Sequence, residues 1–318
     1  MNKHCLALVG LGRILQKRGY RFIAVTPGTH ERLLRREAKS TSLESIFGWS
    51  RPFEADEIER DLMELLVQAD AIKVASGKCK SKVRFATVGD SLFVHSAFPT
   101  TEKDSVFFGP DTYRFVRFLR SALADITTRK VLRLVDIGAG SGVGGITAAK
   151  ALGGSTDLVL ADINRTALAF SAVNATLNEL PETKTVLSDV LTGLEEAADV
   201  IIANPPYLVD EDHRLYRDGG GELGMALALR IVAESMAKLV PGGRLILYSG
   251  APVVDGTDAL LESLQAVLQL YASDFVYEEI DPDVFGGELD KPAYAHVDRI
   301  AAVGLTVIKR GWKFSEYQ

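Results

Sequence analysis

The sequence predicts an α/β protein in which a doubly wound, mainly parallel sheet follows a smaller, mainly helical domain with one hairpin. Three observations predict this fold class. After residue 105, short apolar strands alternate with helical patterns, which is typical of strands joined by crossover helices. Before residue 105, helical patterns lead to two strand patterns around a Gly-Asp turn. A length of 318 residues suits one large domain and a companion, which we expect over residues 106–318 and 1–105.

The composition is that of a globular protein, with 47% hydrophobic and 25% charged residues. It excludes collagen, coiled coils and disordered chains. The two cysteines, Cys5 and Cys79, lack the spacing of a zinc site or a disulfide framework, so we expect a reducing, cytoplasmic setting and no metal. The apolar run from Cys5 to Leu11 is too short for a membrane span.

Charge is distributed unevenly along the chain. Residues 1–105 carry 17 Lys+Arg against 13 Asp+Glu, whereas residues 106–318 carry 19 against 29. The positive excess of the first part indicates contact with an acidic partner or, alternatively, a solvated basic surface.

In the first domain, apolar spacing predicts three helices and a hairpin. The helices run from Leu6 to Arg18, from Pro27 or Thr29 onward, and from about Ala55 to Ala71, and the strands are Val83–Val88 and Ser91–Ser96. Helices followed by a hairpin are typical of a winged helix that recognises a substrate. A helical lid or scaffold beside a substrate groove is the alternative.

In the second domain, seven strands are expected, five of them buried and parallel. The parallel strands are Val131–Asp136, Thr156–Asp162, Thr183–Leu187, Ala198–Asn204 and Gly243–Ser249. Helices are expected between them over Gly144–Leu152, Arg165–Leu180 and Leu223–Leu239. The last two strands, Phe275–Ile280 and Arg299–Ile308, are expected to be joined by a long loop.

Polar or glycine-rich segments follow three successive strands. The glycine-rich turn from Asp136 to Gly142 follows the first strand, and glycines there allow a close backbone approach to a ligand at the start of the next helix. Asp162 ends the second strand, where a carboxylate reaches the hydroxyls of a ribose. Asp189 follows the third strand, as an acceptor for an adenine amino group or as a helix cap. Together they predict an adenosine-containing cofactor.

The fourth strand ends in Asn204-Pro205-Pro206-Tyr207. The two prolines have no N–H and hold the backbone extended, so that the Asn204 side chain and the Pro205 carbonyl leave the sheet edge together. Two acceptors and an aromatic plane suit a flat NH2 group, whose nitrogen they aim at an electrophilic carbon. We therefore predict Asn204, Pro205, Pro206 and Tyr207 as the catalytic residues.

These motifs, with the helix that contains Asn174-Ala175, resemble S-adenosylmethionine-dependent methyltransferases of the Rossmann-like class, and more narrowly the HemK-like or small-domain group. The resemblance implies a seven-stranded methyltransferase sheet and S-adenosyl-L-methionine as cofactor. It implies that the glycine turn holds the methionine part, Asp162 the ribose, Asp189 with Val190 the adenine, and Asn204 to Tyr207 the target nitrogen. The expected cofactor-binding residues are Asp136, Gly138, Ala139, Gly140, Gly142, Asp162, Ile163, Asp189, Val190, Asn204 and Thr112.

The segment Gly109-Pro110-Asp111-Thr112-Tyr113 is similar to the Arg-Pro-Glu-Thr-Glu pattern of protein-glutamine methyltransferases. Pro110 and Thr112 match and Asp111 is chemically similar, but the flanking arginine and glutamate are absent. Farther along, residues 219–221 are three glycines that predict a flexible flap over the target or, alternatively, a plain loop.

The sequence thus predicts an N-methyltransferase that acts on a planar NH2 group. The Pro110-Asp-Thr112 resemblance and the acidic second domain favour a glutamine amide of a protein, because an acidic surface repels a phosphate backbone. The basic first domain favours the exocyclic amine of a nucleobase in RNA or DNA. A cofactor-binding regulator without catalysis is the third alternative. The expected partner is a protein or nucleic-acid methyl acceptor, without a membrane or a metal.

Overall fold

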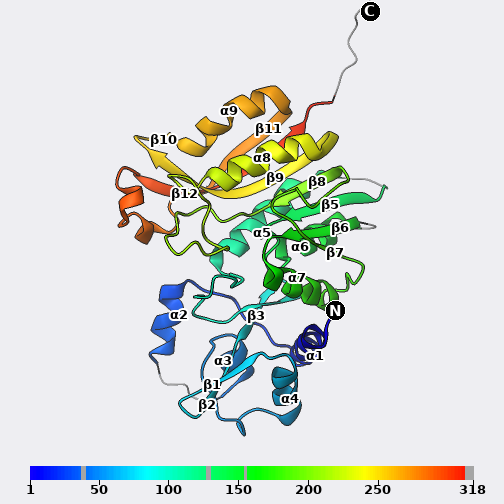
Figure 1. Ribbon diagram of the computed structural model, residues 1–318, viewed down its shortest axis with the longest axis vertical. Helices are drawn as coiled ribbons and strands as arrows, with labels where there is room; N and C mark the ends of the chain where they lie inside the picture. Colours follow the sequence, from blue (N-terminus) through cyan, green and yellow to red (C-terminus); the bar gives the residue numbers. More distant parts are fainter. Residues whose placement is uncertain (37–40, 127–129, 154–155, 312–318) are drawn as a thin grey trace, which may run out of the picture.

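A twisted, mostly parallel sheet forms the centre of the computed structural model, which describes residues 1–36, 41–126, 130–153 and 156–311 (Figure 1). Its strands follow the order β11-β12-β9-β8-β5-β6-β7, with the two-residue β10 (Thr257–Asp258) paired to β9. The five parallel strands are β5 (Leu132–Ile137), β6 (Thr156–Asp162), β7 (Lys184–Leu187), β8 (Ala198–Ala203) and β9 (Leu239–Val254). All five predicted parallel strands are therefore confirmed, and β9 is longer than predicted.

The last two strands are β11 (Ala272–Asp281) and β12 (Arg299–Lys309). β12 lies antiparallel between β9 and β11, so it opposes the direction of the other six strands on this path. Their position confirms the predicted pair at the end of the sheet and the long connection between them. The strand order reverses its direction at β5, so the ends of β5 and β8 leave a crevice at the sheet edge.

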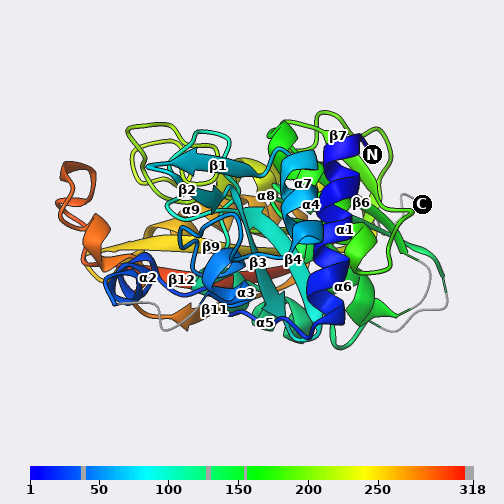
Figure 2. The ribbon, with the colours of Figure 1, turned by 90° about the horizontal axis from the view of Figure 1, so that it is seen from below.

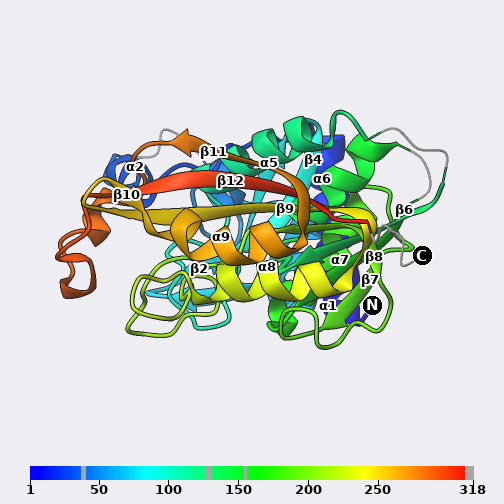
Figure 3. The same cartoon turned by 90° about the horizontal axis from the view of Figure 1, so that it is seen from above.

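Helices cover both faces of the sheet (Figures 1 and 3). One apolar cluster joins the sheet to α5 (Pro110–Leu123), α6 (Val143–Leu152) and α7 (Arg165–Leu177), and another joins its other face to α8 (Ala226–Lys238) and α9 (Ala259–Tyr271). The predicted helices correspond to α6, α7 and α8. The predictions did not include α5 or α9.

The first part of the chain contains four helices and two hairpins within the described residues. They are α1 (Lys3–Lys17), α2 (Pro27–Leu34), α3 (Leu43–Phe47), α4 (Arg60–Gln68), the hairpin of β1 (Ile72–Ala75) and β2 (Lys78–Ser81), and that of β3 (Val83–Val88) and β4 (Ser91–Ser96). The predicted hairpin is confirmed with the predicted strand bounds. The predicted start of the third helix at Ala55 is wrong, because the Glu57 carboxylate accepts from the Glu54 N–H at 2.7 Å in a turn that precedes α4.

The first part packs directly on the sheet layer through α1 and α7, which lie side by side (Figures 1 and 2). The buried Asn174 of α7 uses its whole amide at this junction: its Oδ1 accepts from Val94 N at 2.7 Å, and its Nδ2 donates to Val94 O at 2.9 Å and Ser141 O at 2.8 Å. Val94 belongs to β4 and Ser141 to the glycine-rich turn. One side chain therefore connects the hairpin to the turn after β5.

No helix of the described residues combines the length and the apolar character needed to cross a membrane.

Candidate active site

A cavity of about 220 Å³ lies at the ends of β5, β6 and β8. The predicted site residues that line it are Thr112, Asp136, Gly138, Ala139, Gly140, Asp162, Ile163, Asp189, Val190, Asn204, Pro205, Pro206 and Tyr207. The lining does not include Gly142, which caps the start of α6 in a left-handed conformation with φ +75°. The structure therefore brings every predicted site residue except Gly142 to one cavity.

The glycine-rich turn after β5 has the backbone that the sequence predicts. Gly138 and Gly140 have φ values of +65° and +55°, in the left-handed region that favours glycine. The turn is held against β6, because the Ala139 N–H donates to the Ala161 carbonyl at 3.1 Å. The turn leads directly into α6. Because glycines have no side chain, the backbone of Gly138 and Gly140 faces the cavity directly.

Two buried carboxylates lie beside the turn. The Asp162 carboxylate accepts from Gly140 N at 2.9 Å and from Asn164 N at 2.8 Å. Asp136 accepts from Gly145 N at 2.7 Å. Burial raises the pKa of both carboxyls, that of Asp136 to about 7, where the Asp162 charge adds to the effect. A cationic ligand would favour the ionised form of these groups, so this end of the cavity suits positive charge.

Asp189 lies at the exposed edge of the cavity. Its side chain is 53% exposed, and its Oδ1 accepts from Arg230 Nη1 at 2.7 Å. Oδ2 has no partner of its own within the described residues. The next residue, Val190, is buried and lines the cavity with a positive φ of 52°.

The segment from Asn204 to Tyr207 follows β8, the strand that pairs with β5, and forms a further part of the cavity wall. Among the described residues no group hydrogen-bonds to the Asn204 amide. Tyr207, in contrast, is buried, and its hydroxyl donates to Asp111. Its ring lies where a Cβ on Gly250 of β9 would come within 2.2 Å of the ring carbon Cδ2. One end of the segment is thus free to bind a ligand, and the other is fixed.

Asp111 is a cavity residue that the sequence analysis did not select. It begins α5 next to Thr112, whose Oγ1 accepts from Gly109 N at 3.3 Å. The Asp111 carboxylate accepts from Tyr207 and also from Tyr248 Oη, at 2.5 Å. Burial raises the pKa of Asp111, and the two hydroxyl hydrogen bonds oppose that rise. The Pro110-Asp-Thr112 resemblance is the signal in the sequence that could have found it.

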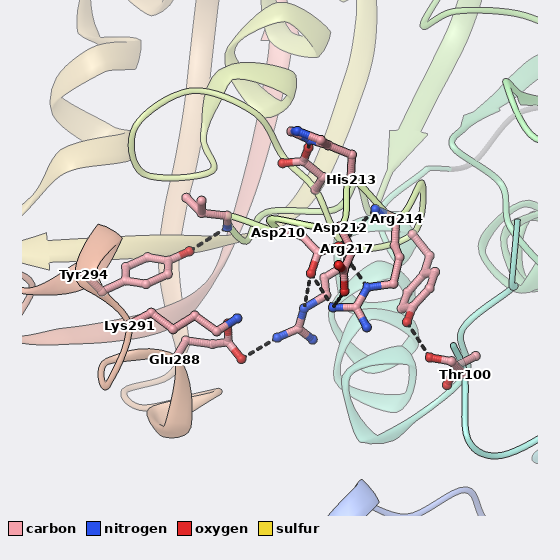
Figure 4. A network of polar contacts seen from close by, with 12 residues as sticks. Thr100, Asp210, Asp212, His213, Arg214, Arg217, Glu288, Lys291 and Tyr294 are labelled. Carbon is pink, nitrogen blue, oxygen red and sulfur yellow. Dashed lines mark hydrogen bonds and ion pairs between the residues drawn. The ribbon is translucent and has the colours of Figure 1, made fainter. Parts of the chain in front are cut away.

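The chain after Tyr207 forms a loop, residues 208–219, that contributes Leu215, Tyr216 and Arg217 to the cavity wall. Figure 4 shows its side-chain contacts. The Tyr216 hydroxyl donates to Thr100 O at 2.8 Å, which joins the loop to the chain that follows β4. The Tyr294 hydroxyl accepts from Val209 N at 2.8 Å, which joins it to the connection between β11 and β12.

Charged side chains form ion pairs within this loop and with the connection between β11 and β12 (Figure 4). Asp210 accepts from Arg214 Nε at 2.8 Å and lies 3.3 Å from Arg217 Nε. Arg217 donates to Glu288, which Lys291 Nζ meets at 2.6 Å. The hydrogen bond with Arg214 lowers the pKa of Asp210 to about 2. These ion pairs hold the loop in one arrangement beside Tyr207.

The three glycines at 219–221 stand at the end of this loop and just after it. The Gly219 N–H donates to Leu208 O at 2.8 Å, and a Cβ on Gly219 would lie 1.9 Å from Gly224 O and 2.8 Å from Pro206 O. A Cβ on Gly224 would lie 2.5 Å from Tyr207 O. Gly219 and Gly224 therefore pack against residues 206–208, whereas a Cβ on Gly220 or Gly221 would approach Ala226. The contacts of Gly219 favour the plain loop, and the flexible flap remains a prediction.

The comparisons agree with this architecture. Residues 115–272 match the family model of the methyltransferase small domain. The chain is 33% identical over 142 residues to a release factor glutamine methyltransferase of Deinococcus radiodurans, which covers 41% of this chain and 49% of the relative. It is 32% identical over 97 residues to a ribosomal protein L11 methyltransferase of Thermoanaerobacter pseudethanolicus, which covers 30% of each.

Among solved structures, M. jannaschii TYW2 in complex with AdoMet has the same fold, with a TM-score of 0.50 at 15% identity. The match covers 76% of this chain and 90% of that one. The chain spans about half the length of the curated relatives it matches. Residues 115–272, which include the glycine-rich turn, Asp162 and the segment from Asn204 to Tyr207, are thus similar to the methyltransferase small domain.

Proposed function

We propose that the protein is an S-adenosylmethionine-dependent N-methyltransferase that acts on a glutamine side-chain amide of a protein. The observation that carries this proposal is the Asn204 amide, which has no partner among the described residues and lines the same cavity as Asp136 and Asp162. A pair of acceptors in the same cavity as a site for positive charge suits the transfer of a methyl group to an NH2 group. The similarity to release factor glutamine methyltransferases supports the amide as acceptor.

The cavity residues fit the cofactor. S-adenosylmethionine carries a sulfonium and an ammonium group, which suit the two buried carboxylates. The Asp162 carboxylate accepts from the backbone N–H groups of Gly140, Asn164 and Ile163, and its two oxygens offer about four lone pairs, so one is left for a ribose hydroxyl. Asp189 Oδ2 and the backbone of Val190 would bind the adenine. When bound, S-adenosylmethionine supplies an electrophilic methyl group.

The chain's own residues then bind and orient the acceptor. Asn204 Oδ1 and the Pro205 carbonyl would accept the two N–H bonds of the amide, while the Tyr207 ring packs against its plane. The nitrogen lone pair of an amide is delocalised, so orientation and hydrogen bonds that strengthen as positive charge develops on nitrogen supply the rate enhancement. As the N–C bond would form, the methyl–sulfur bond of the sulfonium would break and its electron pair would stay on the thioether that leaves. The nitrogen would then be acidic enough to lose its proton to water.

Calorimetry with S-adenosylmethionine tests the cofactor assignment. We expect binding by the wild type and much weaker binding by Asp162→Ala. Asp157→Ala is the matched control, because Asp157 lies in the same strand but pairs with Arg133 and Lys184 away from the cavity. If the folded wild type does not bind, or if Asp162→Ala binds as tightly as Asp157→Ala, the assignment is wrong.

Labelling with methyl-tritiated S-adenosylmethionine tests the acceptor. We expect label in the protein fraction of a cell extract, on glutamine amides after digestion. Label in RNA or DNA, lost steeply as salt is added, would support a nucleobase amine instead, and the positive excess of residues 1–105 favours that alternative. Binding of the cofactor without label in any fraction would support a regulator.

A further inference from the structure

We propose that Asp111 is a positioning residue that fixes the Tyr207 ring against the plane of the methyl acceptor. The inference rests on the proposed function, because it assigns Tyr207 to the acceptor. It adds a residue from α5, outside the four-residue segment that the sequence marks.

Tyr207 is held at three points. Its hydroxyl donates to Asp111, its ring faces Gly250, and its ring centroid lies 5.9 Å from that of Phe285 at an interplanar angle of 65°. A side chain at position 250 would overlap the ring. With packing on the ring and a hydrogen bond at its tip, the side chain is left with one orientation toward the cavity.

Asp111 has the chemistry that this position needs. Two hydroxyls, from Tyr207 and Tyr248, both donate to it, so the site needs two acceptor atoms. A carboxylate supplies both acceptor atoms. An amide supplies only one oxygen, and its NH2 group would face the second hydroxyl as a donor facing a donor. Charge-assisted hydrogen bonds in a buried site are also stronger than neutral ones.

The same contacts argue against a role as general base. Each Asp111 oxygen already accepts a hydroxyl hydrogen bond, and Arg114 Nη1 lies 3.8 Å from Oδ1. Arg114 is itself paired with Asp281 at 2.9 Å. Asp111 therefore acts through Tyr207 rather than on the acceptor proton.

Four variants test the proposal: Asp111→Asn, Tyr207→Phe, their combination, and Tyr248→Phe. Tyr248 donates to the same carboxylate but does not line the cavity, so it matches Tyr207 in chemistry and differs in position. The assay measures the rate of methyl transfer to the acceptor that the wild type labels, with S-adenosylmethionine affinity measured by calorimetry on the same samples.

We expect Asp111→Asn and Tyr207→Phe each to lower kcat by about 10- to 100-fold, as misplacement of a reacting group does, with little change in the affinity for S-adenosylmethionine. The combined variant should be no slower than the slower single variant, because both changes remove the same hydrogen bond. Tyr248→Phe should have a much smaller effect. Multiplicative losses in the combined variant, or equal losses in Tyr248→Phe and Tyr207→Phe, would overturn the proposal.

A measurement without acceptor separates this inference from the proposed function. With ring-labelled tyrosines, NMR should show Tyr207 ring signals displaced by the neighbouring Phe285 ring in the wild type and moved toward their unstructured values in Asp111→Asn, with the signals assigned by their loss in Tyr207→Phe. Unchanged Tyr207 ring signals would overturn the role of Asp111 even if methyl transfer is confirmed. A wild type that transfers no methyl group would overturn the proposed function and leave the ring measurement to decide whether Asp111 fixes Tyr207.

Discussion

The two ends of the cavity are built in different ways. At the carboxylate end, side chains bind backbone N–H groups 9 and 22 residues away, as Asp136 binds Gly145 and Asp162 binds Gly140. At the Asn204–Tyr207 end, side chains bind other side chains far away in sequence, as Tyr207 and Tyr248 both bind Asp111. The first end depends on local backbone shape and the second on packing between distant elements. Substitutions should therefore separate cofactor binding from methyl transfer.

The largest expected effect is that of Asn204→Ala. Loss of the amide oxygen should lower the rate of methyl transfer by about 10²- to 10³-fold, as the loss of a hydrogen bond made to developing charge does. Cofactor affinity and thermal stability should change little, since the amide has no partner within the described residues. Radiolabel transfer, calorimetry and thermal unfolding measure the three quantities. Retained turnover would remove Asn204 from its proposed role.

Gly219→Ala should damage the Asn204–Tyr207 end through packing. Its Cβ would lie 1.9 Å from Gly224 O, so the loop must shift, and we expect a loss of about 1–3 kcal/mol in the free energy of unfolding. Gly287→Ala is the control, because a Cβ there meets nothing within 4 Å. Urea unfolding of both variants checks the difference. Equal free energies of unfolding for the two variants would show that the loop accommodates the Cβ with no loss of stability.

At the carboxylate end, Asp136 should change how the free energy of unfolding depends on pH. The pKa of Asp136 is raised to about 7, so between about pH 4 and 7 the folded chain keeps a proton that the unfolded chain has lost. Asp136 should therefore lower stability as pH rises, by up to about 1.4 kcal/mol per pH unit, and its contribution levels off above pH 7. Urea unfolding from pH 5 to 8 should show a shallower fall for Asp136→Asn than for the wild type. Parallel curves would contradict this.

The smallest effect is expected at the exposed edge. Arg230→Gln removes the ion pair with Asp189, whose side chain is 53% exposed. Such pairs contribute at most about 1 kcal/mol, so the affinity for S-adenosylmethionine should change by less than about fivefold. Calorimetry measures it. A larger change would mean that Arg230 fixes Asp189 in place for the adenine. The exposed ion pair would then contribute to cofactor binding.

The sequence predicted the sheet and the carboxylate end well for a physical reason. Buried parallel strands are continuous apolar runs, and the glycines and carboxylates follow their ends, so chain order alone places Gly138 and Asp162 together. The prediction that residues 1–105 form a separate domain remains a prediction. The short hairpin of β1 and β2 was missed, because a lysine-rich segment of this length has a weak strand pattern.

The Asn204–Tyr207 end was predicted only in part. Asn204 and Tyr207 are contiguous, but Asp111 lies 96 residues from Tyr207 and 137 from Tyr248, and nothing in local spacing indicates such a contact. The departures from the Arg-Pro-Glu-Thr-Glu pattern also have structural reasons that sequence alone did not show. A Cβ on Gly109 would lie 2.5 Å from the Phe107 ring, and the Tyr113 hydroxyl accepts from Ala24 N at 2.9 Å.

Asn174 has a consequence for how the chain can be divided. Its single oxygen and both amide hydrogens are used, on Val94 of the hairpin and on Ser141 of the glycine-rich turn. If the hairpin separated from the turn, the amide would lose two of these three partners at a buried position, which is costly. The first 105 residues should therefore unfold together with the sheet in one cooperative transition. If residues 1–105 were replaced by the corresponding segment of another protein, the chain should fold only where the new strand gives Asn174 the backbone N–H and carbonyl that Val94 gives it.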